Sequence, residues 1–237
     1  MMPSYVRASR QALAISFMTL TACASPQFTT LTVYESPQSF VRLEVDRTLD
    51  REARWNHPVS LSPDQMVALL SGVVFQEPVA KLPLYDDFSQ PRSHSALTES
   101  EIALLAPLLA IALKKASPDE IVTFYHSTAR SATHRLVTSG GLFVEGDNLH
   151  LLLANYRSPT HFNADSGVVD TMDERLTPLR SIAPQRGRLA FEPASWVATP
   201  TEETLPEWLR PKRLEIVVKY QLVQPHPSSQ SPLATTP

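Results

Sequence analysis

The feature that most constrains the fold is a pair of apolar segments, residues 142–145 and 148–156, on either side of Gly146-Asp147. A two-residue Gly-Asp loop between two β-rich segments is a signal for a tight hairpin turn. Strand alternation then places four apolar side chains on one face: Leu142, Val144, Leu149 and Leu151. Phe143 and His150 share the opposite face. We therefore expect an antiparallel hairpin whose leucine-rich face is buried and whose other face is more open.

Apolar patterns elsewhere predict further strands, and they cluster in the second half of the chain. The segments are 30–34, 40–46, 73–76, 121–127, 134–138, 188–191 and 214–223. Within 40–46, strict alternation predicts one buried face and one wet face. Ser139-Gly140-Gly141 is expected to form a turn or bulge with positive φ.

Two helices are predicted, each beginning at a capping box. Ser62-Pro63-Asp64-Gln65 opens the first, and Thr98-Glu99-Ser100-Glu101 opens the second, which runs to about Lys115. The second is apolar on all sides, which is typical of a fully buried helix. Since strands and helices do not alternate regularly, the pattern predicts a single α+β domain: a mainly antiparallel β-sheet packed with two principal helices.

Composition excludes several classes of protein. Hydrophobic residues make up 43% and charged residues 19% of the chain, which is typical of a globular protein. The net charge of -3 provides no basic field, so no nucleic-acid partner is expected. The single Cys excludes an internal disulfide and a multi-Cys zinc site. Six Gly and 21 Pro disfavour a Gly-rich nucleotide-binding fold.

The first 22 residues have the layout of a secretory signal peptide. They contain no Asp or Glu, Arg7 and Arg10 supply a positive start, and the mostly apolar segment 12–20 follows. This segment is shorter than the roughly 20 apolar residues that a membrane-spanning helix needs. We therefore expect it to direct export and to be removed.

The end of this segment, Leu20-Thr21-Ala22-Cys23, resembles the lipobox of bacterial lipoproteins. The resemblance covers residues 1–23, and the only Cys of the chain stands where that motif requires a thiol. It implies that Cys23 receives a diacylglycerol, that the chain is cut before Cys23, and that the new amino terminus is acylated too. Ala24 replaces the Asp that favours inner-membrane retention in this class, which points to the outer membrane, facing the periplasm. A cleaved signal without a lipid is the alternative.

The expected organisation has four parts: a signal peptide (1–22), a lipidated Cys and short tether (23–30), a single α+β globular domain (31–223) and a disordered Pro/Ser/Thr-rich tail (224–237). Acyl chains on Cys23 would make the membrane a stable partner, since two or more chains hold firmly.

Three histidines on predicted strands, His126, His134 and His150, form the candidate polar site. No pair has the spacing of metal-ligating histidines on a helix. A satisfied or half-exposed His is common on a strand, although a His on an open face is available to a metal or a partner. No metal or cofactor is predicted.

Four arginines, Arg175, Arg180, Arg186 and Arg188, form a local basic cluster in an acidic chain. They are candidates for contact with an anion or a partner. The alternative is a solvated face paired with Asp173 and Glu174.

The sequence favours a non-catalytic function. We predict a membrane-anchored, periplasm-facing lipoprotein of the cell envelope that acts as an accessory or binding module for an envelope protein or an amphiphile. An anchored hydrolase acting on peptidoglycan, lipid or glycan is the alternative. A small-ligand or metal-binding module is a third possibility, which predicts a deep apolar cavity or a His/Asp cluster.

Overall fold

The computed structural model describes residues 29–46, 54–78, 92–161, 174–198 and 214–224. The predicted signal peptide, Cys23, the start of the tether and nearly all of the tail lie outside these residues. The elements are β1 (Thr29–Glu35), β2 (Ser39–Val45), α1 (Pro63–Gly72), β3 (Val73–Gln76), β4 (Ser93–Ser95), α2 (Glu99–Lys115), β5 (Glu120–Ala129), β6 (His134–Glu145), β7 (Asn148–His161), η2 (Glu174–Leu176), β8 (Arg188–Phe191), η3 (Ala194–Trp196), β9 (Leu214–Lys219) and η5 (Tyr220–Leu222).

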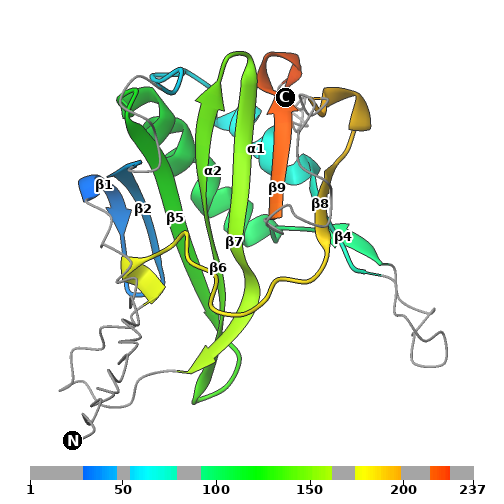
Figure 1. The fold of residues 1–237 in the computed structure, drawn as a ribbon. Coiled ribbons are helices and arrows are strands. Elements are labelled where there is room, and N and C mark those ends of the chain that lie inside the picture. The colour runs from blue at the N-terminus through cyan, green and yellow to red at the C-terminus, as the bar shows by residue number, and fades with distance from the viewer. Residues whose placement is uncertain (1–28, 47–53, 79–91, 162–173, 199–213, 225–237) are drawn as a thin grey trace, which may run out of the picture.

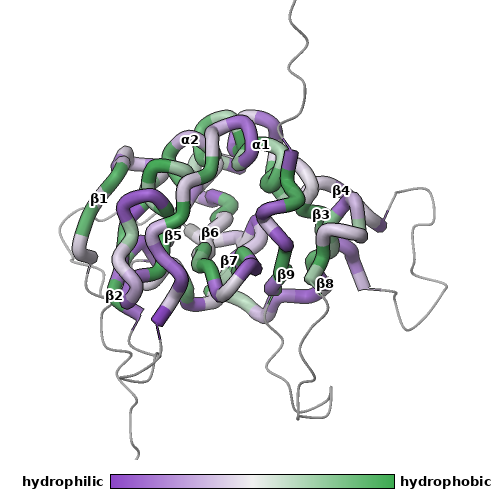
Figure 2. Tube along the Cα trace, turned by 90° about the horizontal axis from the view of Figure 1, so that it is seen from above, coloured by the Kyte–Doolittle hydropathy of each residue, from purple (hydrophilic) through white to green (hydrophobic). Residues whose placement is uncertain are grey.

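The predicted α+β architecture is confirmed. Six strands form one sheet in the order β1-β2-β5-β6-β7-β9, with every neighbouring pair antiparallel. A small second sheet has the order β4-β3-β8. Both α-helices pack on one face of the large sheet, and the small sheet lies at its β9 end (Figures 1 and 2).

The hairpin around Gly146-Asp147 has the predicted register. Leu142 lies opposite Leu151, Val144 opposite Leu149, and Phe143 opposite His150. All four apolar residues of the first face are fully buried against the helices. Gly146 has φ +57°, which a turn glycine adopts without strain.

Of the two alternatives expected at Ser139-Gly140-Gly141, the turn is wrong, because β6 runs through all three residues. The register of β6 against β7 is irregular at Ser139, as a bulge requires, but the positive φ expected at the glycines is absent. The glycines are required for space instead. A Cβ at Gly140 would lie 1.9 Å from the carbonyl oxygen of Leu152 on β7, and one at Gly141 would lie 3.0 Å from the Leu179 side chain.

Both predicted capping boxes are present. The Ser62 side chain accepts from Gln65 N–H, the Thr98 side chain accepts from Glu101 N–H, and each N3 side chain accepts from its N-cap backbone. The prediction that α2 is buried on all sides is wrong. Its sheet-facing side is buried, whereas Ala103 and Ile111 on the outer side are exposed.

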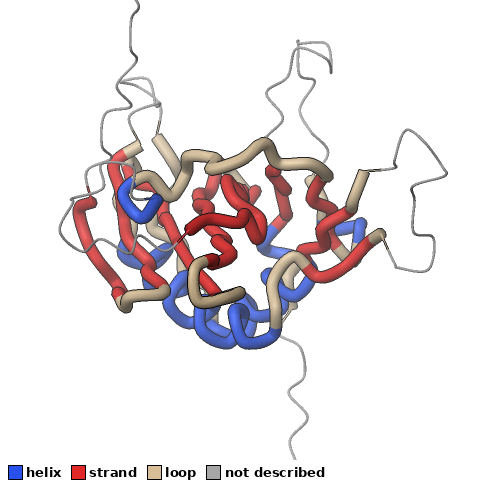
Figure 3. Tube along the Cα trace, turned by 90° about the horizontal axis from the view of Figure 1, so that it is seen from below, coloured by secondary structure: helices blue, strands red, loops and turns tan. Residues whose placement is uncertain are grey.

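The prediction that one face of β2 is exposed to solvent is also wrong, because both faces of the sheet are covered there. Residues 174–185, which we call the strap, cross the face opposite the helices (Figures 1 and 3). The Ser139 hydroxyl donates to Pro178 O at 2.7 Å, and Asn155 both donates to Arg180 O and accepts from Ile182 N–H. Ile182 packs on a small second core of Phe40, Tyr125 and Val137. Phe40 of β2 is therefore buried, and Glu44 of the same strand is buried as well.

Candidate functional site

A groove of about 790 Å³ lies where the two sheets and the two helices meet. It is lined by the end of α1, the residue after β3, β4, the first turn of α2, and the irregular point of β7. The lining residues are Ser71, Glu77, His94, Ser95, Leu97, Thr98, Glu99, Ile102 and Arg157.

One wall of the groove is built on an aromatic stack. Phe75 of β3 stacks on Tyr156 of β7 with ring centroids 4.0 Å apart. The Tyr156 hydroxyl forms a 2.7 Å hydrogen bond with His94 Nε2, which fixes the imidazole in the groove wall. Burial raises the pKa of Tyr156 above its usual value of 10, so this hydroxyl keeps its proton at neutral pH.

Arg157 supplies positive charge beside this wall. Its guanidinium carbon lies 5.6 Å from the centre of the Tyr156 ring. Its φ of +43° is unusual for a residue with a side chain, and it lies between Asn155 and Ser158, where the pairing of β7 with β6 is irregular. The exposed side chain therefore projects from a bend in the strand rather than from a regular pleat.

The lining combines groups of both charge signs with an apolar floor. Arg157 is the cation, Glu77 and Glu99 are the carboxylates, and Leu97 and Ile102 are apolar and buried. The Ser95 hydroxyl donates to Leu97 O at 2.6 Å, so its proton is already engaged. This combination suits the binding of a ligand that carries polar groups on an apolar body.

The three predicted histidines do not come together. His126 on β5 shares a 2.7 Å hydrogen bond with the Ser39 hydroxyl, and the exposed His134 contacts the Thr133 hydroxyl at 2.8 Å. His150 lies by the hairpin turn, opposite Phe143. Within the described ranges, no group of three His, Cys, Asp or Glu side chains is arranged to hold a metal.

The expectation of an open face at His150 is not met. Its side chain is only 13% exposed, its ring stacks on Phe143 at 4.5 Å, and Nδ1 lies 2.8 Å from the Glu215 carboxylate. Trp55 packs on the same Phe143 ring at 4.0 Å. A segment far away in the sequence therefore covers part of this face.

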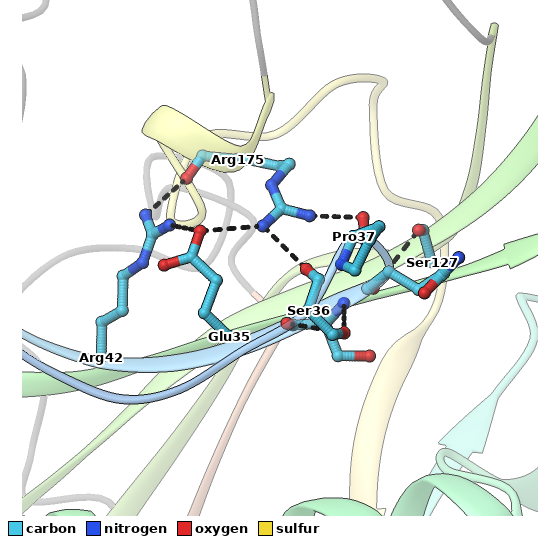
Figure 4. Close-up of polar contacts among 8 residues, drawn as sticks. Glu35, Ser36, Pro37, Arg42, Ser127 and Arg175 are labelled. Carbon is cyan, nitrogen blue, oxygen red and sulfur yellow. Dashed lines mark hydrogen bonds and ion pairs between the residues drawn. The ribbon is translucent and has the colours of Figure 1, made fainter.

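The four predicted arginines are also separated. Arg175 reaches the β1–β2 turn, where it donates to Pro37 O, to Ser36 O at 3.0 Å and to the Glu35 carboxylate at 3.2 Å (Figure 4). Arg188 donates to Gln76 on the small sheet at 2.7 Å, near the other end of the strand order. Arg180 and Arg186 are exposed. Glu174, which was expected to pair with this cluster, forms an ion pair at 2.9 Å with Arg135, which lies outside the cluster.

Sequence reasoning missed a buried acid, Glu44. It is 1% exposed, and burial raises the pKa of its carboxyl to about 7. The Arg42 guanidinium and the nearby Thr123 hydroxyl offset only part of that rise. Glu44 Oε2 makes no hydrogen bond within the described part of the chain. The alternating pattern of residues 40–46 had predicted the opposite, namely that Glu44 lies on a solvent-exposed face.

Sequence reasoning also missed a buried base, His57. Its Nε2 accepts a hydrogen bond from the Val144 backbone N–H at 3.0 Å. A proton on Nε2 would remove this acceptor and would point at the N–H of Val144. Burial lowers the pKa of His57 to about 4, and Glu120 opposes this only in part. His57 is therefore neutral at pH 7 and holds the segment before α1 against β6. No motif surrounds it in the sequence.

Comparison with protein-family models, curated proteins and solved structures finds no match to this chain.

Proposed function

We propose that this protein is a lipid-anchored, periplasm-facing accessory protein of the cell envelope, which binds a partner protein or an amphiphile and catalyses no reaction. The observation that carries the proposal is Leu20-Thr21-Ala22-Cys23, with the only Cys of the chain at the acceptor position. Lipid chains at this position would attach the domain to the membrane without any spanning segment.

The position of the first strand supports a close attachment. β1 begins at Thr29, inside the predicted tether and only six residues after Cys23. Six residues of extended chain reach about 20 Å. The part of the chain that the structure describes contains no helix long and apolar enough to cross a membrane. An anchor at Cys23 would thus hold the domain at the membrane surface.

The groove supports a binding role. Its apolar floor and its charged rim suit a ligand with an amphipathic surface, such as a protein segment or a lipid-like molecule. The hydrogen bond between His94 and Tyr156 holds both side chains in place. The aromatic wall therefore presents a ligand with a rigid apolar surface and a polar edge in a fixed position.

The anchor is tested by fractionation of cells that produce the full chain. We expect the unmodified chain to remain with membranes after a high-salt wash, because acyl chains, unlike ion pairs, are insensitive to salt. We expect Cys23→Ser to lose this salt-resistant association. Cys23→Ser protein that stays with washed membranes as fully as the unmodified chain would argue against the anchor.

The groove is tested by affinity capture of the detergent-solubilised protein. Arg157→Glu reverses the cation of the groove, and Arg186→Glu reverses an exposed arginine outside it. We expect Arg157→Glu to lose a partner or lipid that the unmodified chain and Arg186→Glu both retain. Equal capture by all three proteins would show that the groove is not the binding site.

A further inference from the structure

In the part of the chain that the structure describes, the outer side of α2 is apolar and partly exposed. Its residues, which we call the α2 outer face, are Ala103, Leu104, Pro107, Leu108 and Ile111. Ala103 and Ile111 are exposed, Ile111 by 44%, and the other three are half-buried. The exposed Lys114 and Lys115 follow at the end of the helix. An exposed apolar strip that ends in cations suits contact with the acyl boundary and the anionic headgroups of a membrane surface.

The start of β1 lies beside the lysine end of this face. The Thr30 hydroxyl is hydrogen-bonded to the Glu120 carboxylate and lies 3.2 Å from Leu43 O. The same Glu120 carboxylate accepts from Ser117 N–H at 2.7 Å, and Ser117 stands two residues after Lys115. α2 also packs directly against β1 (Figure 2). The chain that leads to Cys23 therefore meets the domain next to the C-terminal end of α2.

We propose that the α2 outer face rests on the phospholipid surface to which Cys23 is anchored. This inference depends on the proposed lipid anchor, because the anchor is what brings a bilayer within about 20 Å of Thr29. The anchor thus keeps a bilayer close to the Lys115 end of α2, and burial of the strip in that bilayer removes exposed apolar area from water. Lys114 and Lys115 meet the phosphate groups of anionic lipids.

The test uses the lipidated full chain in vesicles of phosphatidylethanolamine and phosphatidylglycerol. Since Cys23 is the only Cys and the lipid blocks its thiol, an introduced Cys can be labelled alone. Ile111→Cys places an environment-sensitive fluorophore on the α2 outer face. Leu176→Cys is the matched control, because Leu176 is an exposed apolar residue in η2, by the β1–β2 turn at the far end of β1.

A quencher attached to the lipid acyl chains should remove most of the emission at position 111 and little at position 176. Lys114→Glu together with Lys115→Glu should weaken the quenching at position 111 and leave flotation with the vesicles unchanged. Quenching at position 111 that does not respond to this double substitution would refute contact of the lysines with the headgroups.

The remaining outcomes separate this inference from the lipid anchor itself. Protein that floats with the vesicles while both labels stay in water would overturn the docking and leave the anchor in place. A label at position 111 that is shielded from aqueous quenchers by a co-purified protein, and not by lipid, would assign the face to a protein partner and overturn the docking. Protein that does not float would overturn both proposals.

Discussion

Replacing Gly140 by alanine is expected to destabilise the domain by about 3 to 5 kcal/mol, at the upper end of single substitutions. The added Cβ would lie 1.9 Å from Leu152 O and 3.0 Å from its carbonyl carbon. Both atoms belong to the backbone of the paired strand β7, so no side-chain rotation relieves the overlap. The two central strands of the sheet would have to separate.

Gly146→Ala is the matched control, since it has the opposite local environment. No atom lies within 4 Å of a Cβ at Gly146, and only the φ of +57° opposes the change. Its expected cost is about 1 kcal/mol. Denaturant unfolding of both variants measures the difference. If Gly140→Ala is no more damaging than Gly146→Ala, β6 and β7 do not approach one another as closely as the structure shows.

Glu44→Gln is expected to stabilise the domain relative to the unmodified chain as the pH rises, by up to about 3 kcal/mol above pH 7. The pKa of Glu44 is about 7 in the folded state, against an ordinary value of 4.5. Folding therefore favours the protonated acid. The contribution of Glu44 to stability is complete below about pH 4.5 and is lost as the pH rises through 7. Gln has nearly the same shape and no acidic proton to lose, so it stays neutral at every pH.

His57 has the opposite effect on stability. Its pKa is about 4 in the folded state, below the ordinary 6.5, so its contribution is present above pH 6.5 and is lost as the pH falls towards 4. Between about pH 4.5 and 6.5, a rise in pH makes the contribution of Glu44 to the free energy of unfolding smaller and that of His57 larger. The two effects therefore oppose one another in the unmodified chain. In Glu44→Gln, of these two contributions only the pH dependence from His57 remains, so the free energy of unfolding should rise with pH across this window.

The measurement is the free energy of unfolding of both proteins in denaturant between about pH 4.5 and 8. The informative quantity is the difference between the two proteins at each pH, because effects of other groups cancel. A difference that does not change with pH would mean that Glu44 ionises normally in the folded protein.

Local signals in the sequence predicted the parts of the fold that local chemistry determines. The Gly146-Asp147 turn established the register of β6 and β7, and the capping residues Ser62 and Thr98 marked where both helices begin. Each of these features depends on residues within a few positions of one another. Their prediction needed no knowledge of the remaining chain.

Features that depend on distant segments could not be predicted in this way. The alternating pattern around Glu44 is that of a half-exposed strand, but the folded sheet buries its carboxyl near Thr123 of the distant strand β5. The groove brings together residues from Ser71 to Arg157, which no local motif connects. The outer side of α2 looked like core because its composition resembles core, whereas the structure leaves Ala103 and Ile111 exposed.

The central claim, a lipid anchor at Cys23, is tested most directly by the mass of the amino-terminal peptide of the protein purified from membranes. We expect this peptide to begin at Cys23 and to carry a diacylglycerol and a further acyl chain. The Cys23→Ser chain should yield no acylated peptide. An unmodified Cys23 at the amino terminus of the membrane-purified protein would contradict the account.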